Sequence, residues 1–130
     1  MKILVGFDRS KASEDALNLA LQHAQAFSAE VHIMTSLEQG ADLRKEDIDK
    51  AENQLEKARK PFRAADVECE VHTSVSYQSP GEDMVRFAKD KGIDQIVIGV
   101  RRRSKVGKLV TGSTAQYIIL NAPCPVLSVK

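Results

Sequence analysis

Short apolar runs alternate with helical patterns along the whole chain, and this alternation limits the folds that the sequence can adopt. Runs rich in β-branched and aliphatic residues predict strands at residues 2–7, 31–36, 67–75, 94–98 and 125–129. The segments between them repeat apolar residues at steps of three and four, which is typical of amphipathic helices. Strands separated by helices indicate crossover connections and a parallel sheet. We therefore predict an α/β fold, a single doubly wound domain over residues 1–130, with a five-stranded parallel sheet and helices on both faces.

Local signals predict where the helices begin and end. Ser10 can cap the first helix, and Ser79-Pro80-Gly81-Glu82 has the form of a capping box with proline at the first helical position. The second helix is highly charged over residues 44–63, so we expect a solvated outer face, and Pro61 is predicted to kink or end it. Residues 37–42 predict a polar loop before this helix.

The charge distribution is uneven although the total charge is nearly balanced. The 130 residues include 19 Lys and Arg against 18 Asp and Glu, so the surface as a whole does not favour polyanions. One short stretch nevertheless carries five cations: Arg101, Arg102, Arg103, Lys105 and Lys108. The rest of the chain is then net acidic, and a basic stretch on such a background indicates a local anion site.

The cysteines and the apolar segments indicate the compartment. Cys69 and Cys124 lie far apart in apolar surroundings, which favours a reduced pair over a disulfide. The apolar stretch after Met1 is too short for a signal peptide, and no window is long and apolar enough for a membrane span. We therefore expect a cytoplasmic protein without a membrane partner.

The basic stretch begins where the fourth predicted strand ends. Residues 99–114 read GVRRRSKVGKLVTGST and contain three glycines and no acidic residue. In a parallel α/β sheet, ligands bind beyond the carboxyl ends of the strands, where the strand order reverses. Asp8 and Ser36 end the first two strands, so they belong to the same edge. Backbone N–H groups and hydroxyls of Gly112-Ser113-Thr114 open the last helix, where negative charge is favoured. These features predict an anion site.

Two common phosphate-binding motifs are absent, and a simpler interpretation stays open. A Walker A motif fails because Gly107-Lys108 is followed by Leu109, and no Gly-x-Gly-x-x-Gly follows the first strand. Alternatively, Gly112 only starts a helix, Ser113 and Gln116 form a capping box, and the cations are solvated. A nucleic-acid patch is the weakest alternative, because the basic loop has no aromatic residue and no broad basic face accompanies it. We expect no nucleic-acid partner.

Several segments in order resemble the universal stress protein family. They are ILVGFDRSKASEDAL at the start, QIVIGV before the basic loop, NAPCPVLSV at the end, and the glycine frame from Gly99 to Gly112-Ser113. The resemblance covers the whole chain. It implies the Rossmann-like fold of the adenine nucleotide alpha hydrolase type, adenine-nucleotide binding in one branch of the family, and a homodimer formed by the last strands.

The same resemblance implies the contacts of a bound nucleotide, which is ATP or another adenine nucleotide, with or without Mg²⁺. The implied contacts are Asp8 at the nucleoside, the backbone of Ser36 at the adenine edge, Gly99 and Val100 beside the ribose and phosphates, and Gly112, Ser113 and Thr114 at the phosphates.

One position departs from the family motif. Arg102 stands where the motif has its second glycine, which can supply a positive φ or clearance for phosphates. Either the loop takes a slightly different path and Arg102 or Arg103 clamps the phosphates, or the site is degraded. The second outcome describes a dimeric interaction protein of the same fold that does not bind nucleotide. The intact Gly112-Ser113-Thr114 and the concentrated cations favour the first, so Arg101 and Arg102 join the candidate site.

The three histidines indicate neither a metal site nor a catalytic site. His23 is predicted on a helix and His32 and His72 on strands, and no nearby pair has ligand spacing. We interpret them as surface or packing residues, and we expect no metal ligands.

No nucleophile–histidine pattern and no paired carboxylates are readable, so we do not class the chain as an enzyme, although slow ATP hydrolysis stays open. We expect an ATP-binding regulatory protein of a stress response, acting as a dimeric switch or interaction module with unknown protein partners. The apolar C-terminal strand, Pro125 to Lys130, needs cover as a sheet edge, and a second copy can supply it.

Overall fold

A computed structural model of the chain describes residues 1–100 and 112–130. Strands and helices alternate through these residues as the sequence predicts. In chain order they are β1 (Lys2–Gly6), α1 (Lys11–Phe27), β2 (Glu30–Glu38), α2 (Lys45–Ala64), β3 (Cys69–Ser76), α3 (Pro80–Lys91), β4 (Gln95–Gly99), α4 (Ser113–Asn121) and β5 (Val126–Val129). None of these described helices has the length and apolarity that crossing a membrane requires.

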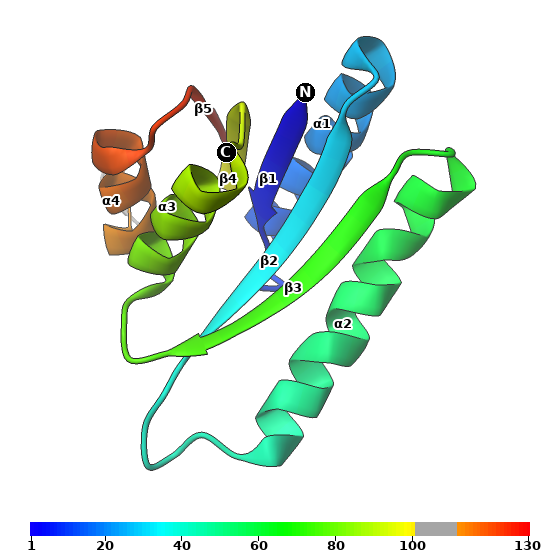
Figure 1. Cartoon of the computed structure of the whole chain (residues 1–130). Helices are drawn as coiled ribbons and strands as arrows, with labels where there is room; N and C mark the ends of the chain where they lie inside the picture. The colour runs from blue at the N-terminus through cyan, green and yellow to red at the C-terminus, as the bar shows by residue number, and fades with distance from the viewer. Residues whose placement is uncertain (101–111) are drawn as a thin grey trace, which may run out of the picture.

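The five strands form a parallel sheet in the order β3-β2-β1-β4-β5 (Figure 1). From β1 the chain moves outward to β3, and it then returns to the other side of β1 for β4 and β5. The strand order therefore reverses between β1 and β4, the place where sheets of this type bind ligands. The predicted doubly wound α/β fold is confirmed.

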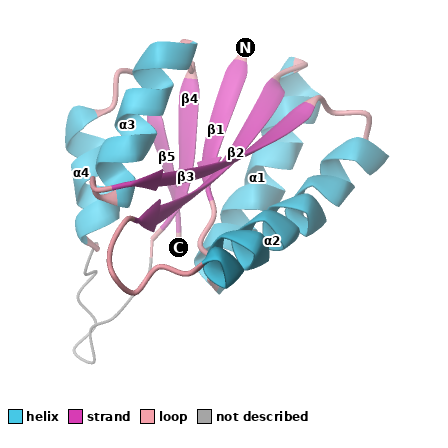
Figure 2. Ribbon diagram, turned by 60° about the horizontal axis from the view of Figure 1, so that its bottom comes forward, coloured by secondary structure: helices cyan, strands magenta, loops and turns pink. Residues whose placement is uncertain are grey.

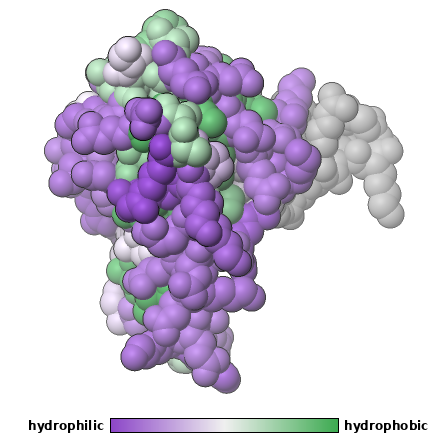
Figure 3. All heavy atoms as spheres, turned by 90° about the vertical axis from the view of Figure 1, so that its right-hand side faces the viewer, coloured by the Kyte–Doolittle hydropathy of each residue, from purple (hydrophilic) through white to green (hydrophobic). Residues whose placement is uncertain are grey.

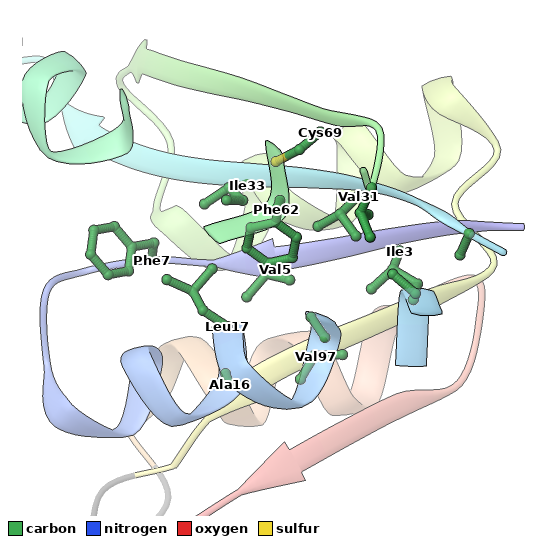
Figure 4. Packing of buried hydrophobic residues seen from close by; sticks show 14 of the residues in the cluster. Ile3, Val5, Phe7, Ala16, Leu17, Val31, Ile33, Phe62, Cys69 and Val97 are labelled. Atoms are coloured by element: carbon green, nitrogen blue, oxygen red, sulfur yellow. The ribbon is translucent and has the colours of Figure 1, made fainter. Parts of the chain in front are cut away.

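The central strands supply two separate cores, because alternate side chains point to opposite faces of a sheet. On one face, Ile3 and Val5 pack with residues of α1 and with Phe62 of α2 (Figure 4). On the other face, Leu4 packs with residues of α3 and α4. Figure 2 shows the two pairs of helices on either side of the strands. This sandwich explains why β1 is apolar without alternation.

The long helix α2 is amphipathic. Leu55 and Phe62 are buried, and Figure 3, which views the side where α2 lies, shows a mostly hydrophilic surface. Pro61 does not end the helix, which continues to Ala64. The prediction that Pro61 ends the helix is wrong, because a proline in the last turn removes only one N–H donor and the Pro61 carbonyl still accepts the N–H of Ala65 at 3.2 Å.

Strand β2 is longer than the sequence pattern indicates. Leu37 and Glu38, predicted in a polar loop, pair with Val75 and Ser76 of β3. On its other side β2 loses its partner earlier, because β1 ends at Gly6 opposite Met34. The carboxyl end of β2 therefore extends past β1 and leaves one edge of its backbone uncovered by that strand.

Candidate functional site

An open cleft of about 1020 Å³ lies at the carboxyl ends of the strands. The ends of β1, β2 and β4 line it, together with the amino-terminal parts of α1, α2, α3 and α4. Its position is the switch point of the sheet, between the paired strands β1 and β4, whose following helices α1 and α4 lie on opposite faces. The volume is that of a site for a cofactor-sized molecule.

Gly99 allows α1 to begin close to the end of β4. A Cβ atom at this position would clash with the backbone carbonyl group of Ala12 and would lie 2.7 Å from the backbone nitrogen of Ser13. Only a residue without a side chain permits that approach. Gly99 therefore brings the amino terminus of α1 to the wall of the cleft.

Asp8 lies in the turn between β1 and α1. Its Oδ1 accepts the N–H of Ser10 at 3.0 Å, and its own N–H lies 3.4 Å from the Ser13 hydroxyl. Ser10 caps α1 as predicted, because its Oγ accepts the N–H of Ser13 at 3.1 Å. Between these residues Arg9 adopts a positive φ of 68°, which is uncommon outside glycine. The turn fixes Asp8 at the cleft wall.

The end of β2 presents backbone groups to the cleft. Backbone polar groups along a strand point alternately to its two neighbours. The carbonyl of Met34 accepts the N–H of Phe7 on the β1 side, whereas the N–H of Gln39 donates to Ser76 on the β3 side. By this alternation the N–H and C=O of Ser36 point to the β1 side, where β1 has ended. The Ser36 hydroxyl oxygen is also buried and has no hydrogen-bond partner among the described residues.

Helix α4 begins at the cleft with an amino terminus that no side chain of the described residues caps. The N-cap is Gly112, so the alternative in which Ser113 and Gln116 form a capping box is wrong. The N–H of Gln116 instead donates to the carbonyl of Gly112 at 3.0 Å. Glycine has no side chain to accept the first N–H groups of the helix, and these donors at the positive end of the helix dipole suit an anion.

Seven of the predicted site residues line this cleft. They are Asp8, Ser36, Gly99, Val100, Gly112, Ser113 and Thr114. Arg101 and Arg102 lie outside the described residues. The wall formed by Asp47, Lys50 and Gln54 of α2 was not predicted, because in the sequence these residues resemble any solvated helix face. The contacts of all these residues with a nucleotide stay predictions.

The sequence profile of the universal stress protein family matches residues 1–130 of this chain. This chain belongs to the universal stress protein family.

Three relatives illustrate the range of similarity to this universal stress protein. A universal stress protein from Archaeoglobus fulgidus has 37% sequence identity and a TM-score of 0.90, covering 100% of this chain and 98% of that chain. A structure of the universal stress protein from the same organism in complex with dAMP has 32% identity and a TM-score of 0.84, with the same coverage. Universal stress protein MJ0531 from Methanocaldococcus jannaschii is 32% identical over 143 residues, covering 99% of this chain and 81% of that protein.

A second polar group of this universal stress protein lies on the same sheet, away from the cleft. The prediction that no nearby pair of histidines has ligand spacing is wrong, because Nδ1 of His32 and Nε2 of His72 are 3.0 Å apart. The pairing of β2 with β3, which sets His32 opposite Glu70, brings them together. Burial, reinforced by His32, lowers the pKa of His72. The alternation of polar residues along β3 indicates that His72 and Glu70 share one face of the strand. Only the register between β2 and β3 brings His72 into contact with His32.

Proposed function

We propose that this universal stress protein binds an adenine nucleotide, ATP, in the cleft and acts as a regulatory protein of a stress response. The observation that supports this most is the pairing of two features in one cleft: the open backbone edge of β2 at Ser36 and the start of α4, whose N-cap Gly112 has no side chain. The first suits the donor and acceptor pattern of a base edge, and the second suits phosphate oxygens. The relative solved with dAMP supports an adenine nucleotide as the ligand class.

The remaining residues fit the parts of the nucleotide between base and phosphates. Asp8 can accept hydrogen bonds from ribose hydroxyls, and Gly99 and Val100 lie where the sugar would pass from β2 toward α4. The hydroxyls of Ser113 and Thr114 add donors at the phosphate end. Mg²⁺, when bound with ATP, supplies positive charge to the phosphates.

A regulatory role is favoured over catalysis by the chemistry of the lining. The described residues of the cleft include no histidine and no cysteine. Histidine, the most frequent general base in enzymes, is therefore missing from the part of the lining that the structure describes. Binding that changes the protein's conformation or partners is the simpler use of such a cleft.

A calorimetric titration with Mg-ATP tests nucleotide binding, using protein refolded from denaturant to remove any carried-over ligand. We expect saturation near one ATP per chain and weaker binding of GTP, whose base edge reverses the donor and acceptor pattern. No binding of either nucleotide across the micromolar range would favour the alternative function, a dimeric interaction protein of the same fold that does not bind nucleotide.

Substitution of Ser113 distinguishes a specific loss of phosphate binding from a loss of binding caused by unfolding. Ser113→Asp places a carboxylate at the first turn of α4, where it stabilises the helix dipole but repels phosphates. ATP affinity should fall at least about tenfold while the protein stays folded. Ser113→Asn is the matched control, because it has nearly the same shape without the charge. Equal losses in both variants would show that charge at this terminus is irrelevant to binding.

The role of Arg102 has its own test. If Arg102 helps to bind the phosphates, Arg102→Ala weakens ATP binding, and the weakening is smaller for AMP because fewer phosphates are contacted. Unchanged or tighter ATP binding in Arg102→Ala contradicts that role. Arg102→Gly, which restores the family's glycine, shows whether backbone freedom can substitute for the charge.

We further propose a homodimer through β5, the edge strand at one end of the sheet. The carbonyls of Pro125 and Val129 bind β4, so by alternation Val126 and Ser128 direct their backbone groups to the open edge. Ser128→Pro removes one outward N–H without touching the β4 ladder and should convert dimer to monomer in sedimentation experiments. Ser128→Ala is the control and should remain dimeric. A monomeric parent protein would contradict the proposal.

A further inference from the structure

His32, Glu70 and His72 form a compact cluster near the amino ends of β2 and β3, opposite to the ends that line the cleft. Nδ1 of His32 lies 3.0 Å from Nε2 of His72 and 3.5 Å from Oε2 of Glu70, and the remaining pair is 3.8 Å apart. Phe87 of α3 packs against both imidazoles, with ring centroids 4.7 Å from His72 and 5.7 Å from His32. The cluster therefore sits between the sheet and α3, with its ring positions constrained by packing.

These three atoms have the mutual spacing of metal ligands. Zinc bonds of about 2.0–2.1 Å in a tetrahedral site place neighbouring ligand atoms about 3.3–3.4 Å apart. The three distances in the cluster, 3.0, 3.5 and 3.8 Å, lie on both sides of that value. The Glu70 side chain is 59% exposed and can turn, so small rotations would equalise the distances. Two histidines and one carboxylate leave the fourth position for water.

His32 is arranged as an oriented ligand. Its side chain is buried, and its Nε2 has no hydrogen-bond partner among the described residues. A metal ion on Nδ1 requires the proton to be on Nε2, which lies 3.9 Å from Oε1 of Glu30. A carboxylate beside the second nitrogen is the usual device that fixes the tautomer of a metal-bound histidine. A small movement of Glu30 would complete that hydrogen bond.

The surrounding charges favour a particular class of metal. Glu30 and Glu70 are opposed by Lys2, which lies 3.8 Å from Glu30, and by Lys91, which acts on His72. The field is therefore nearly balanced, so attraction of a hard cation by charge alone is weak. Calcium and magnesium also require more oxygen ligands than this cluster offers. Imidazole nitrogens suit zinc, cobalt, nickel and copper.

We propose that His32 Nδ1, His72 Nε2 and the Glu70 carboxylate bind one divalent transition-metal ion, with zinc as the expected metal. The ion replaces the hydrogen bond between the two imidazoles, and each ring carries its proton on the nitrogen away from the metal. Because β3 is an edge strand, the metal joins it to β2 at the end opposite the nucleotide cleft. The site is independent of nucleotide binding.

Cobalt absorption spectroscopy tests this proposal with the full chain, prepared without a histidine tag and stripped with a chelator. We expect saturable visible bands at one Co²⁺ per chain, and their loss when Zn²⁺ is added. No thiolate-to-cobalt band should appear, because Cys69 points into the opposite core and is not a ligand.

Two exposed or half-exposed ligands provide the test variants. His72→Gln and Glu70→Gln should each lower cobalt affinity at least about tenfold. His23→Gln removes a histidine of α1 outside the cluster and should leave the affinity unchanged. Circular dichroism checks that each variant is folded. A substitution of His32, whose side chain is buried, is not needed for the conclusion.

The proposal is overturned by absence of saturable cobalt or zinc binding at micromolar concentration. It is equally overturned if His72→Gln and Glu70→Gln bind cobalt as tightly as the parent protein, or if His23→Gln loses as much affinity as they do. In the last two cases the metal binds elsewhere on the chain.

Discussion

The row of polar side chains that β3 presents to α3 differs between its two halves. In the carboxyl half, the Ser76 hydroxyl lies 2.8 and 3.0 Å from the two carboxylate oxygens of Asp83, and the Ser74 hydroxyl donates to Asp83 at 3.2 Å. Arg86 adds a donor at 2.9 Å. Asp83 is only 3% exposed, so these donors replace the water that its charge has lost.

In the amino half of the row, His72 of β3 meets His32 of the neighbouring strand β2 beside the same helix, and these polar groups are incompletely paired. His72 and His32 share one hydrogen bond, and Nε2 of His32 stays buried without a partner among the described residues. A buried polar atom in that condition lowers stability, and such atoms are rare in folded proteins. The difference between the halves distinguishes a polar cluster that stabilises the fold from one whose geometry suits a ligand.

Replacement of Asp83 should have the largest effect. Asp83→Ala removes the acceptor for two serines of β3 and for Arg86 of α3 itself. We expect the free energy of unfolding to fall by about 3 kcal/mol, because hydrogen bonds to a buried charge are stronger than neutral ones. Urea denaturation measures this change.

Asp90→Ala is the matched control for Asp83→Ala, since Asp90 is exposed on the same helix. Its effect should stay within about 0.5 kcal/mol. Equal effects of the two substitutions would mean that the hydrogen bonds of Asp83 do not stabilise the fold. The carboxyl half of the row would then not differ from the amino half in this respect.

Zinc should stabilise the protein by nearly as much as Asp83 does. At a free zinc concentration one hundred times the dissociation constant, a site present only in the folded state adds about 2.7 kcal/mol to the free energy of unfolding. Urea denaturation with zinc and then with excess chelator measures the gain and its reversal. His72→Gln should show no gain. A gain of the same size in that variant would place the binding outside the cluster.

Most of the fold could be predicted from the sequence because its signals are local. The apolar run Ile3-Leu4-Val5 and the helix caps at Ser10 and Ser79 each depend on neighbouring residues. The errors lie where tertiary contacts decide. Leu37 and Glu38 extend β2 only because β3 pairs with them, and Pro61 is tolerated because the helix has one turn left.

The cleft and the histidine cluster differ in the same way. The position of Asp8, Ser36 and Gly112 at one edge follows from the rule that parallel strands end together, so a sequence can predict that they converge. The contact of His32 with His72 depends on a register between strands 40 residues apart in the chain. Composition and residue spacing do not determine that register. A shift of β3 by one residue against β2 would turn His72 to the opposite face of the sheet.

Ser76→Ala gives a smaller effect and sharpens the description of the carboxyl half. Its hydroxyl donates to Asp83 and accepts the N–H of Gln78 at 3.1 Å. We expect a loss of about 1 kcal/mol in the free energy of unfolding. Ser74→Ala, which removes one longer hydrogen bond, should lose less. If Ser74→Ala were the more destabilising, the shorter bonds of Ser76 would not be the ones that hold β3 to α3.

The smallest effect is expected for His72→Gln in metal-free protein, about 0.5 kcal/mol in urea denaturation. His72 is half-buried, so water can replace its hydrogen bond to Nδ1 of His32. Nε2 of His32 has no partner among the described residues even with that bond in place. A loss as large as that of Asp83→Ala would mean that the imidazole pair is a structural element like the serine–aspartate group. The same substitution should nevertheless abolish stabilisation by zinc. A residue that contributes little to the apo fold but decides metal binding is what separates a binding site from a structural cluster, so the two measurements on one variant test the contrast directly.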